Sequence, residues 1–295
     1  MPNHWRKHAS DPRPGITPML NEGPAHDALA LHLQRQREAE GNRPTADDTR
    51  FRGSMAGECA RKIAFQIMEY PPQLDLETST LVAFDIGQSY HEVIQAGMVE
   101  HLGAELEVVC THKPRLSLSS HADAVYDETA VEIKSMKAFA WSLAVEGNGY
   151  EHRGPGPKPE HLIQAGISAM ANDVHAKRVH MIYVCKDTGE LAEWIIGMDE
   201  PLIHLGGPPF PTVRELALAE MLRFAHIDED MAAGNMPARD VPGYGLVDHR
   251  PPAAGSKDKP WNCRYCAYQP VCKSQPHGAF PIEEVKWPTT TTRSS

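Results

Sequence analysis

The middle of the chain contains two short apolar segments, Ala122–Tyr126 and Ala130–Ser135, which are separated by a polar turn. Alternating apolar and polar residues over segments of this length are typical of β-strands. Two such strands pair as a hairpin, and a hairpin is stable only when other elements cover its apolar face. Helical patterns lie on both sides of it, over Ser54–Tyr70, Thr78–Leu102 and Thr212–Ala233. The sequence therefore predicts an α/β fold built around this hairpin.

The hairpin brings charged residues together. A turn centred between Asp127 and Glu128 would place Asp123 directly opposite Glu132. Because side chains alternate along a strand, Lys134 shares the face of Glu132. Two facing carboxylates repel each other unless a positive charge lies near them. A cation would therefore stabilise this end of the hairpin.

A divalent cation with oxygen ligands suits such a site, and Mg²⁺ or Mn²⁺ is commonly completed by water and phosphate. The backbone carbonyl of Ile133 is a further candidate ligand. Lys134 would position and help to deprotonate an attacking water, or offset the charge on a phosphate. The alternative is an ordinary exposed hairpin, in which Glu132 and Lys134 form a surface ion pair.

The composition of the chain predicts how it is divided. Residues 1–50 form a flexible arm with one possible helix at Ala25–Glu40, and residues 51–235 form the core. Within the core we also expect these elements: strands at Glu105–Cys110, Arg115–Leu118, Arg178–Cys185 and Glu190–Ile196, and a helix from Glu160 to about Asn172. The remaining parts are a Pro-rich linker (236–260), a cysteine cluster (261–275) and a polar tail (276–295).

Charge and hydropathy exclude some classes of function. The 295 residues include 29 basic and 39 acidic side chains, so the formal net charge is −10. This balance argues against a protein that coats nucleic acid by bulk electrostatics. It leaves room for a nuclease, which grips a phosphodiester with a small basic groove and metal ions. No apolar run suits a membrane span or a secretory signal, so we expect a cytoplasmic protein without membrane contact.

The six cysteines are more typical of metal ligands or free thiols than of disulfides in such a protein. Cys263, Cys266 and Cys272 lie close together in the sequence, and three thiols need a fourth ligand to close a tetrahedral zinc site or an iron–sulfur cluster. The candidates for the fourth ligand are Cys59, Cys110 and Cys185. Of these, Cys110 and Cys185 lie in predicted strands, where a small buried apolar residue is the usual interpretation.

The hairpin residues Asp123 and Glu132-Ile-Lys134 resemble the PD-(D/E)XK nuclease motif in its RecB-like form. That family adds a histidine in a Gly-x-x-x-His helix pattern, which Gly87 and His91 match. These two residues share a helix face, and the absent side chain of Gly87 would let that face approach another backbone. The resemblance implies that His91 joins Asp123, Glu132 and the Ile133 carbonyl as a metal ligand, and imidazole suits Mn²⁺ better than Mg²⁺.

The family also places a glutamine on the helix that follows the lysine-bearing strand, and Gln164 matches this position. By this resemblance the catalytic residues are Asp123, Glu132, Lys134 and Gln164. The tyrosine usually found four residues later is replaced by Ser168. The contact with DNA that such a tyrosine makes is therefore absent here or has moved to a residue such as Tyr150.

The order of the cysteines, one before the nuclease motifs and three after them, resembles the iron–sulfur branch of the RecB-like family. That branch contains AddB-type nuclease domains and CRISPR-adaptation exonucleases. The resemblance implies that Cys59 closes a 4Fe-4S cluster with Cys263, Cys266 and Cys272 and that the cluster is structural. Arg61 and Lys62 match the basic pair of the family and are expected to touch DNA phosphate. A zinc site with the same four ligands is the alternative.

The resemblance covers about residues 51–275. It implies a restriction-endonuclease-like core, which is a central mixed β-sheet flanked by helices, with an N-terminal helical part and a C-terminal iron–sulfur subdomain. It also implies a metal-dependent DNA exonuclease that prefers single strands and acts in recombination, repair or CRISPR-type processing, with protein partners from those pathways. Tyr150, Trp141 and Phe139 could stack on unpaired bases, although core packing is an equal alternative for the last two. The other functions considered are a non-catalytic DNA-binding module stapled by the cluster, and an endonuclease of the same superfamily.

Overall fold

The computed structural model describes residues 49–73, 77–113, 115–147, 154–205, 209–240 and 266–287, with residues 29, 31, 32, 35 and 263. Most of the predicted N-terminal arm, most of the Pro-rich linker, the end of the polar tail and Tyr150 lie outside these residues. The chain divides into two compact units, residues 1–43 with 76–83 and residues 44–75 with 84–295. In the smaller unit, the described residues 29, 31, 32 and 35 are helical. The sheet and the sites described below belong to the larger unit.

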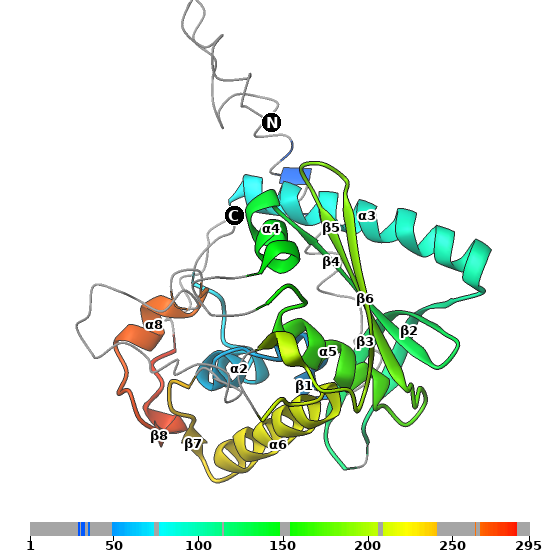
Figure 1. Cartoon of the computed structure of the whole chain (residues 1–295). Coiled ribbons are helices and arrows are strands. Elements are labelled where there is room, and N and C mark those ends of the chain that lie inside the picture. The colour runs from blue at the N-terminus through cyan, green and yellow to red at the C-terminus, as the bar shows by residue number, and fades with distance from the viewer. Residues whose placement is uncertain are drawn as a thin grey trace, which may run out of the picture. The chain divides into compact units, whose positions relative to one another are not determined.

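A mixed six-stranded sheet forms the centre of the larger unit (Figure 1). Its strands are β1 (Phe51–Arg52), β2 (Glu105–Thr111), β3 (Leu118–Tyr126), β4 (Thr129–Met136), β5 (Arg178–Cys185) and β6 (Leu191–Gly197). The central strands follow the order β3-β4-β5-β6, with β4 and β5 parallel and the other two pairs antiparallel. Both β1 and β2 pair with β3, in parallel and antiparallel directions respectively. This confirms the predicted α/β fold with a central mixed sheet.

Helices cover both faces of the sheet (Figure 1). On one face, Ile94 and Met98 of α3 (Thr78–Leu102) pack against Val131, Ile133 and Ile182 of the sheet. On the other face, α5 (Pro159–Ala169) and α6 (Val213–Ala232) share the main apolar core with β4 and β5. Because the sheet is covered on both faces, β5 is buried from Val179 to Cys185. Such a mostly apolar run, interrupted only by His180, is expected for a strand in the middle of a sheet.

The predicted boundaries are correct for some elements. Helix α3 and strand β5 have the predicted limits, and α6 lies within its predicted range. Helix α6 begins with a capping box, in which Thr212 and Glu215 each accept a backbone N–H of the other residue. These elements are long or carry strong end signals, so their sequence alone defines them.

Other boundaries were predicted wrongly. Helix α2 (Ala60–Ile67) begins later than Ser54, because Gly57 adopts a left-handed conformation with φ of 78° and only a short 3₁₀ turn precedes it. Residues 115–117 form a turn and not a strand, since they close the hairpin between β2 and β3. Helix α4 (Ala138–Glu146) was not predicted, because its residues are apolar on nearly every face.

The C-terminal segment packs against α2. The ring of Tyr268 stacks on Phe65 of α2 at 5.3 Å between centroids, and the backbone N–H of Gln73 donates to the carbonyl of Ala267 at 2.9 Å. Short strands β7 (Asn235–Met236) and β8 (Phe280–Pro281) pair nearby, and a five-residue helix α8 (Gln269–Lys273) carries Cys272. The sequence predicts a polar tail after residue 275, but Phe280 is buried here, because it completes the apolar cluster around α2.

Within the described residues, no helix is long and apolar enough to cross a membrane.

Candidate active site

Asp123 lies at the point where β3 leaves β4. The hairpin has the predicted register, because Ala124 pairs with Val131 and Tyr126 with Thr129, but the pairing ends there. Upstream, Leu118 and Ser119 of β3 pair with β1 instead. Asp123 therefore does not face Glu132 across a ladder as predicted. Its Oδ2 instead accepts the backbone N–H of Ile133 at 2.6 Å, which replaces a ladder hydrogen bond.

Glu132 is buried on β4, with only 2% of its surface exposed. Its Oε1 lies 2.5 Å from Nζ of Lys134, which confirms that the two side chains share a face. Its Oε2 is buried without a hydrogen-bond partner. Burial raises the pKa of Glu132 from 4.5 to about 7, the Lys134 ammonium lowers it, and the Asp123 carboxylate raises it. The exposed surface pair considered from the sequence is thereby excluded.

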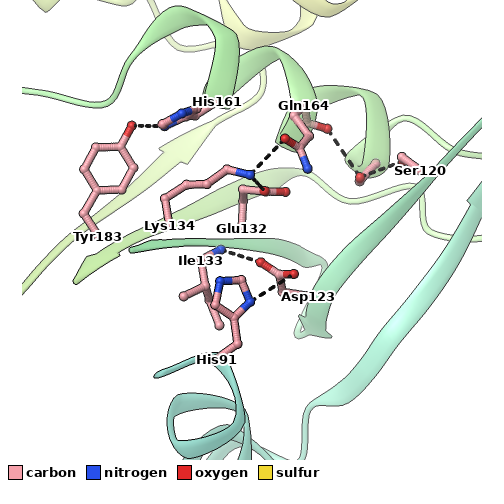
Figure 2. A network of polar contacts seen from close by, with 10 residues as sticks. His91, Ser120, Asp123, Glu132, Ile133, Lys134, His161, Gln164 and Tyr183 are labelled. Carbon is pink, nitrogen blue, oxygen red and sulfur yellow. Dashed lines mark hydrogen bonds and ion pairs between the residues drawn. The ribbon is translucent and has the colours of Figure 1, made fainter. Parts of the chain in front are cut away.

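Gln164 projects from α5 toward Lys134 (Figure 2). Its Oε1 accepts a hydrogen bond from Nζ of Lys134 at 3.0 Å, so the ammonium is held between an amide and a carboxylate. One turn later, Ser168 is buried, and its Oγ lies 2.8 Å from Oγ of Ser120 on β3. The position that carries a tyrosine in the resembled family is thus used here to pack α5 on the sheet.

His91 approaches Asp123 from α3. Its Nδ1 lies 3.6 Å from Oδ1 of Asp123, and both side chains are mostly buried. Gly87 was predicted to let α3 approach another backbone, but the neighbouring atoms belong to side chains. A Cβ atom at this position would lie 2.7 Å from Oγ of Ser135. The ammonium end of Lys186 lies next to the same position at 3.3 Å, so a larger residue requires these side chains or α3 to move. Gly87 therefore permits the close approach that brings His91 to the site.

The two halves of the site lie on opposite sides of β4 in Figure 2, with Glu132, Lys134 and Gln164 on one side and Asp123 and His91 beside Ile133. Among the described residues, no group of three or more His, Cys, Asp or Glu side chains is already arranged around a metal position. The donor set itself, two carboxylates and an imidazole, suits Mn²⁺ or Mg²⁺. The unpartnered Oε2 of Glu132 is a buried oxygen that such a cation would satisfy.

A tyrosine and a histidine behind Lys134 were missed by the sequence analysis. The Tyr183 hydroxyl lies 2.6 Å from Nδ1 of His161 and accepts the backbone N–H of Lys158 at 2.9 Å (Figure 2). Burial, followed by the charges of Lys134 and Lys158, lowers the pKa of His161 well below its usual value. The imidazole is therefore neutral at physiological pH. The only available signal was that His161 lies one helical turn before Gln164.

Three of the four cysteines predicted to bind a cluster lie near enough for charge on Cys272 and Cys59 to affect the pKa of Cys266. Cys59 precedes α2 directly, and Cys266 and Cys272 pack against the apolar cluster on the same helix. Burial raises the pKa of Cys266, Lys62 lowers it, and negative charge on Cys272 or Cys59 raises it. Cys263 lies close to Cys266 in the sequence, and its carbonyl accepts a hydrogen bond from Nε2 of Gln269 at 2.6 Å.

The other two cysteines behave as buried apolar residues. Cys110 and Cys185 lie in β2 and β5 and are 0% and 1% exposed. This is the placement expected for thiols that serve packing.

Arg61 does not take the predicted position for a DNA contact. Its side chain is fully buried, because its guanidinium donates to carbonyls of the C-terminal region: those of Pro237, Pro276, His277 and Gly278. Lys62 is partly exposed and pairs with Glu58. Among the aromatic candidates, Phe139 is 74% exposed, whereas Trp141 packs against the main core.

No protein-family model and no curated protein matches this chain. Among solved structures it is similar to SSO0001, with 16% identity over 85% of this chain and 96% of that one and a TM-score of 0.46. It is also similar to an alkaline exonuclease (LHK-Exo) from Laribacter hongkongensis, with 14% identity over 62% of this chain and 92% of that one and a TM-score of 0.35. The complex of LHK-Exo with dAMP gives 16% identity over 61% and 95% and a TM-score of 0.34.

Proposed function

We propose that the protein is a metal-dependent deoxyribonuclease that hydrolyses phosphodiester bonds as an exonuclease. The observation that carries this proposal is the buried Glu132, whose Oε2 has no partner although Lys134 and Asp123 lie nearby. A buried carboxylate without a full set of partners is destabilising unless it is protonated or binds a cation. A carboxylate whose pKa is raised by burial beside specific charges is typical of functional sites.

In this proposal Glu132, Asp123, His91 and the Ile133 carbonyl hold Mn²⁺ or Mg²⁺. When bound, the cation would supply Lewis acidity, lowering the pKa of a coordinated water and offsetting negative charge on the phosphate and the leaving oxygen. The Asp123 carboxylate is already oriented by the N–H of Ile133. This orientation reduces the ordering that metal binding requires.

Lys134 positions the attacking water. Two of the three hydrogens on its ammonium are directed at Glu132 Oε1 and Gln164 Oε1. The third hydrogen would then be available to a water or a phosphate oxygen. Gln164 thus acts by fixing the rotamer of Lys134, and its amide N–H groups remain for a phosphate oxygen or a water.

The experiment that tests this function compares Glu132→Ala with wild type for Mn²⁺-dependent degradation of end-labelled DNA. We expect loss of degradation, with DNA binding and the cysteine site unchanged. Glu105→Ala, which removes an exposed carboxylate from β2, is the matched control and should cleave normally. Cleavage by Glu132→Ala at the wild-type rate would contradict the mechanism.

We further propose that Cys59, Cys263, Cys266 and Cys272 bind a 4Fe-4S cluster that fastens the C-terminal segment to α2. Support comes from the mutual charge effects among Cys59, Cys266 and Cys272, and from Arg61 and Lys62 beside them. These cations offset the negative charge of a thiolate-bound cluster. Protein purified without oxygen should be brown, and Cys59→Ala should lose the colour. A colourless protein that contains zinc would replace the cluster with a zinc site and leave the nuclease proposal intact.

Single-stranded DNA is the substrate that we propose. The exposed ring of Phe139, which follows β4 by three residues, supports this choice, because base stacking on aromatic side chains requires unpaired bases. Degradation of single- and double-stranded DNA, each labelled at either end, will give the strand preference and the polarity. Equal degradation of both, unchanged in Phe139→Ala, would contradict this part of the proposal.

A further inference from the structure

Asp123 forms no ladder pair with either of the strands beside it, β4 and β2. Toward β4 the pairing ends at Ala124. Toward β2, Leu106 pairs with Ala124 and Val108 pairs with Ala122, but the residue between them, Glu107, has a left-handed φ of 49° and forms no pair with Asp123. An L-residue with side chain beyond Cβ adopts this conformation only when its surroundings hold it there.

The backbone carbonyl of Asp123 is satisfied by a side chain of α3. Gln95 lies one turn after His91 and is only 5% exposed. Its Nε2 donates to the Asp123 carbonyl at 2.8 Å and to Oε1 of Glu107 at 2.6 Å. Both amide hydrogens of Gln95 are thus used, and both bonds hold the two strands at the place where their ladder is interrupted.

The two hydrogen bonds of Gln95 differ in what they fix. The bond to Glu107 is charge-assisted and draws β2 toward α3. The bond to the Asp123 carbonyl fixes the peptide group that carries the Asp123 side chain, and without it a part-buried acceptor would lose its partner. The N–H of Ile133 holds the same residue by its carboxylate. Asp123 is therefore clamped at both its backbone and its side chain.

We propose that Gln95 is a positioning residue that orients Asp123 for binding the catalytic cation. This inference rests on the proposed function. Helix α3 then serves Asp123 twice, through His91 at the carboxylate and through Gln95 at the backbone. Glu107 is an auxiliary partner that directs the Gln95 amide and does not itself orient Asp123.

The test is Mn²⁺ binding to the metal-free full-length protein, measured by electron paramagnetic resonance of the free ion. Gln95→Met, which keeps the length of the side chain and removes the donor, should weaken Mn²⁺ binding roughly 10- to 100-fold. Glu107→Ala leaves the bond between Gln95 and Asp123 in place and should bind Mn²⁺ within about threefold of wild type. Gln88→Met makes the same substitution at an exposed position of α3 and should have no effect.

Three results would overturn the positioning role. Gln95→Met could bind Mn²⁺ as tightly as wild type. Gln95→Met and Glu107→Ala could weaken binding equally, which would reduce Gln95 to a tether between α3 and β2. Wild type could fail to bind Mn²⁺, which would overturn the metal site and the positioning role together. Cleavage of DNA by wild type is measured alongside: if Gln95→Met lowers Mn²⁺ affinity but wild type cleaves nothing, the proposed function falls and the positioning role stands.

Discussion

Glu132→Gln should stabilise the metal-free protein at neutral and alkaline pH and abolish cleavage. Glutamine has nearly the same shape as glutamate, and its Oε1 can still accept a hydrogen bond from Lys134. Glutamine carries no charge. The variant therefore escapes the desolvation of a buried carboxylate, which in wild type raises the pKa of Glu132 from 4.5 to about 7. The activity is lost because an amide is a poor ligand for Mg²⁺ or Mn²⁺ compared with a carboxylate.

The size of the effect follows from the linkage between pKa and stability. The folded-state pKa lies above the unfolded value, so the stability that the protonated Glu132 contributes is complete below pH 4.5 and is lost as the pH rises through about 7. Glu132→Gln should therefore exceed wild type in the free energy of unfolding by about 3 kcal/mol at pH 8. The same relation gives a difference of about 1 kcal/mol at pH 5.5.

The assay is urea unfolding of both proteins at several pH values, with a chelator present to exclude metal ions. The difference in the free energy of unfolding should grow with pH and level off above pH 8. Saturating Mn²⁺ should restore wild type at pH 8 and leave Glu132→Gln nearly unchanged. A difference that does not change with pH, or a wild type that is the more stable protein at pH 8, would refute the conclusion that a buried charge destabilises the metal-free site.

The remaining predictions concern the metal site, the approach of α3 and the C-terminal segment. The Mn²⁺ affinity of wild type should rise with pH up to about 7 and then level off, because Glu132 must lose its proton to bind the ion. Isothermal titration calorimetry at several pH values will measure the affinity. Gly87→Val should reduce DNA cleavage by displacing α3. Gly97 lies on the same helix and faces open space, so Gly97→Ala should stabilise the protein by about 0.5–1 kcal/mol through its higher helix propensity and raise the melting temperature. Arg61→Met should destabilise the protein by about 3 kcal/mol or more and expose the C-terminal segment to proteolysis, because it removes the donor to the buried carbonyl of Pro237 and the part-buried carbonyl of Gly278. Lys62→Met should change the stability by less than about 1 kcal/mol.

Local features of the chain were predictable from the sequence. The limits of α3 follow from a long helical pattern that ends at Gly103, and those of β5 from a mostly apolar run. The register of the β3–β4 hairpin follows from the position of its turn, which is why Ala124 pairs with Val131 as predicted. In each case the deciding interactions are made between residues that are close in the chain.

The arrangement within the site could not be predicted, because distant segments decide it. The position of the hairpin turn places Asp123 opposite Glu132, but the pairing of β3 with β4 ends at Ala124, and the start of β3 pairs with β1 instead. The burial of Arg61 depends on residues more than 170 positions later in the chain, so its sequence context indicated an exposed basic pair.

These long-range contacts explain how the fold accommodates the buried charge of Glu132. Glu132 is destabilising as a buried charge in the metal-free protein, yet its neighbours are held by bonds that do not depend on metal. The Asp123 carbonyl is bound by Gln95 of α3, 28 residues away, and Lys134 is bound by Gln164 of α5, 30 residues away. The two helices lie on opposite faces of the sheet, and each packs there through its own apolar contacts. The destabilisation by the buried Glu132 carboxylate, whose Oε2 alone lacks a partner, is therefore offset by a framework that packing stabilises separately.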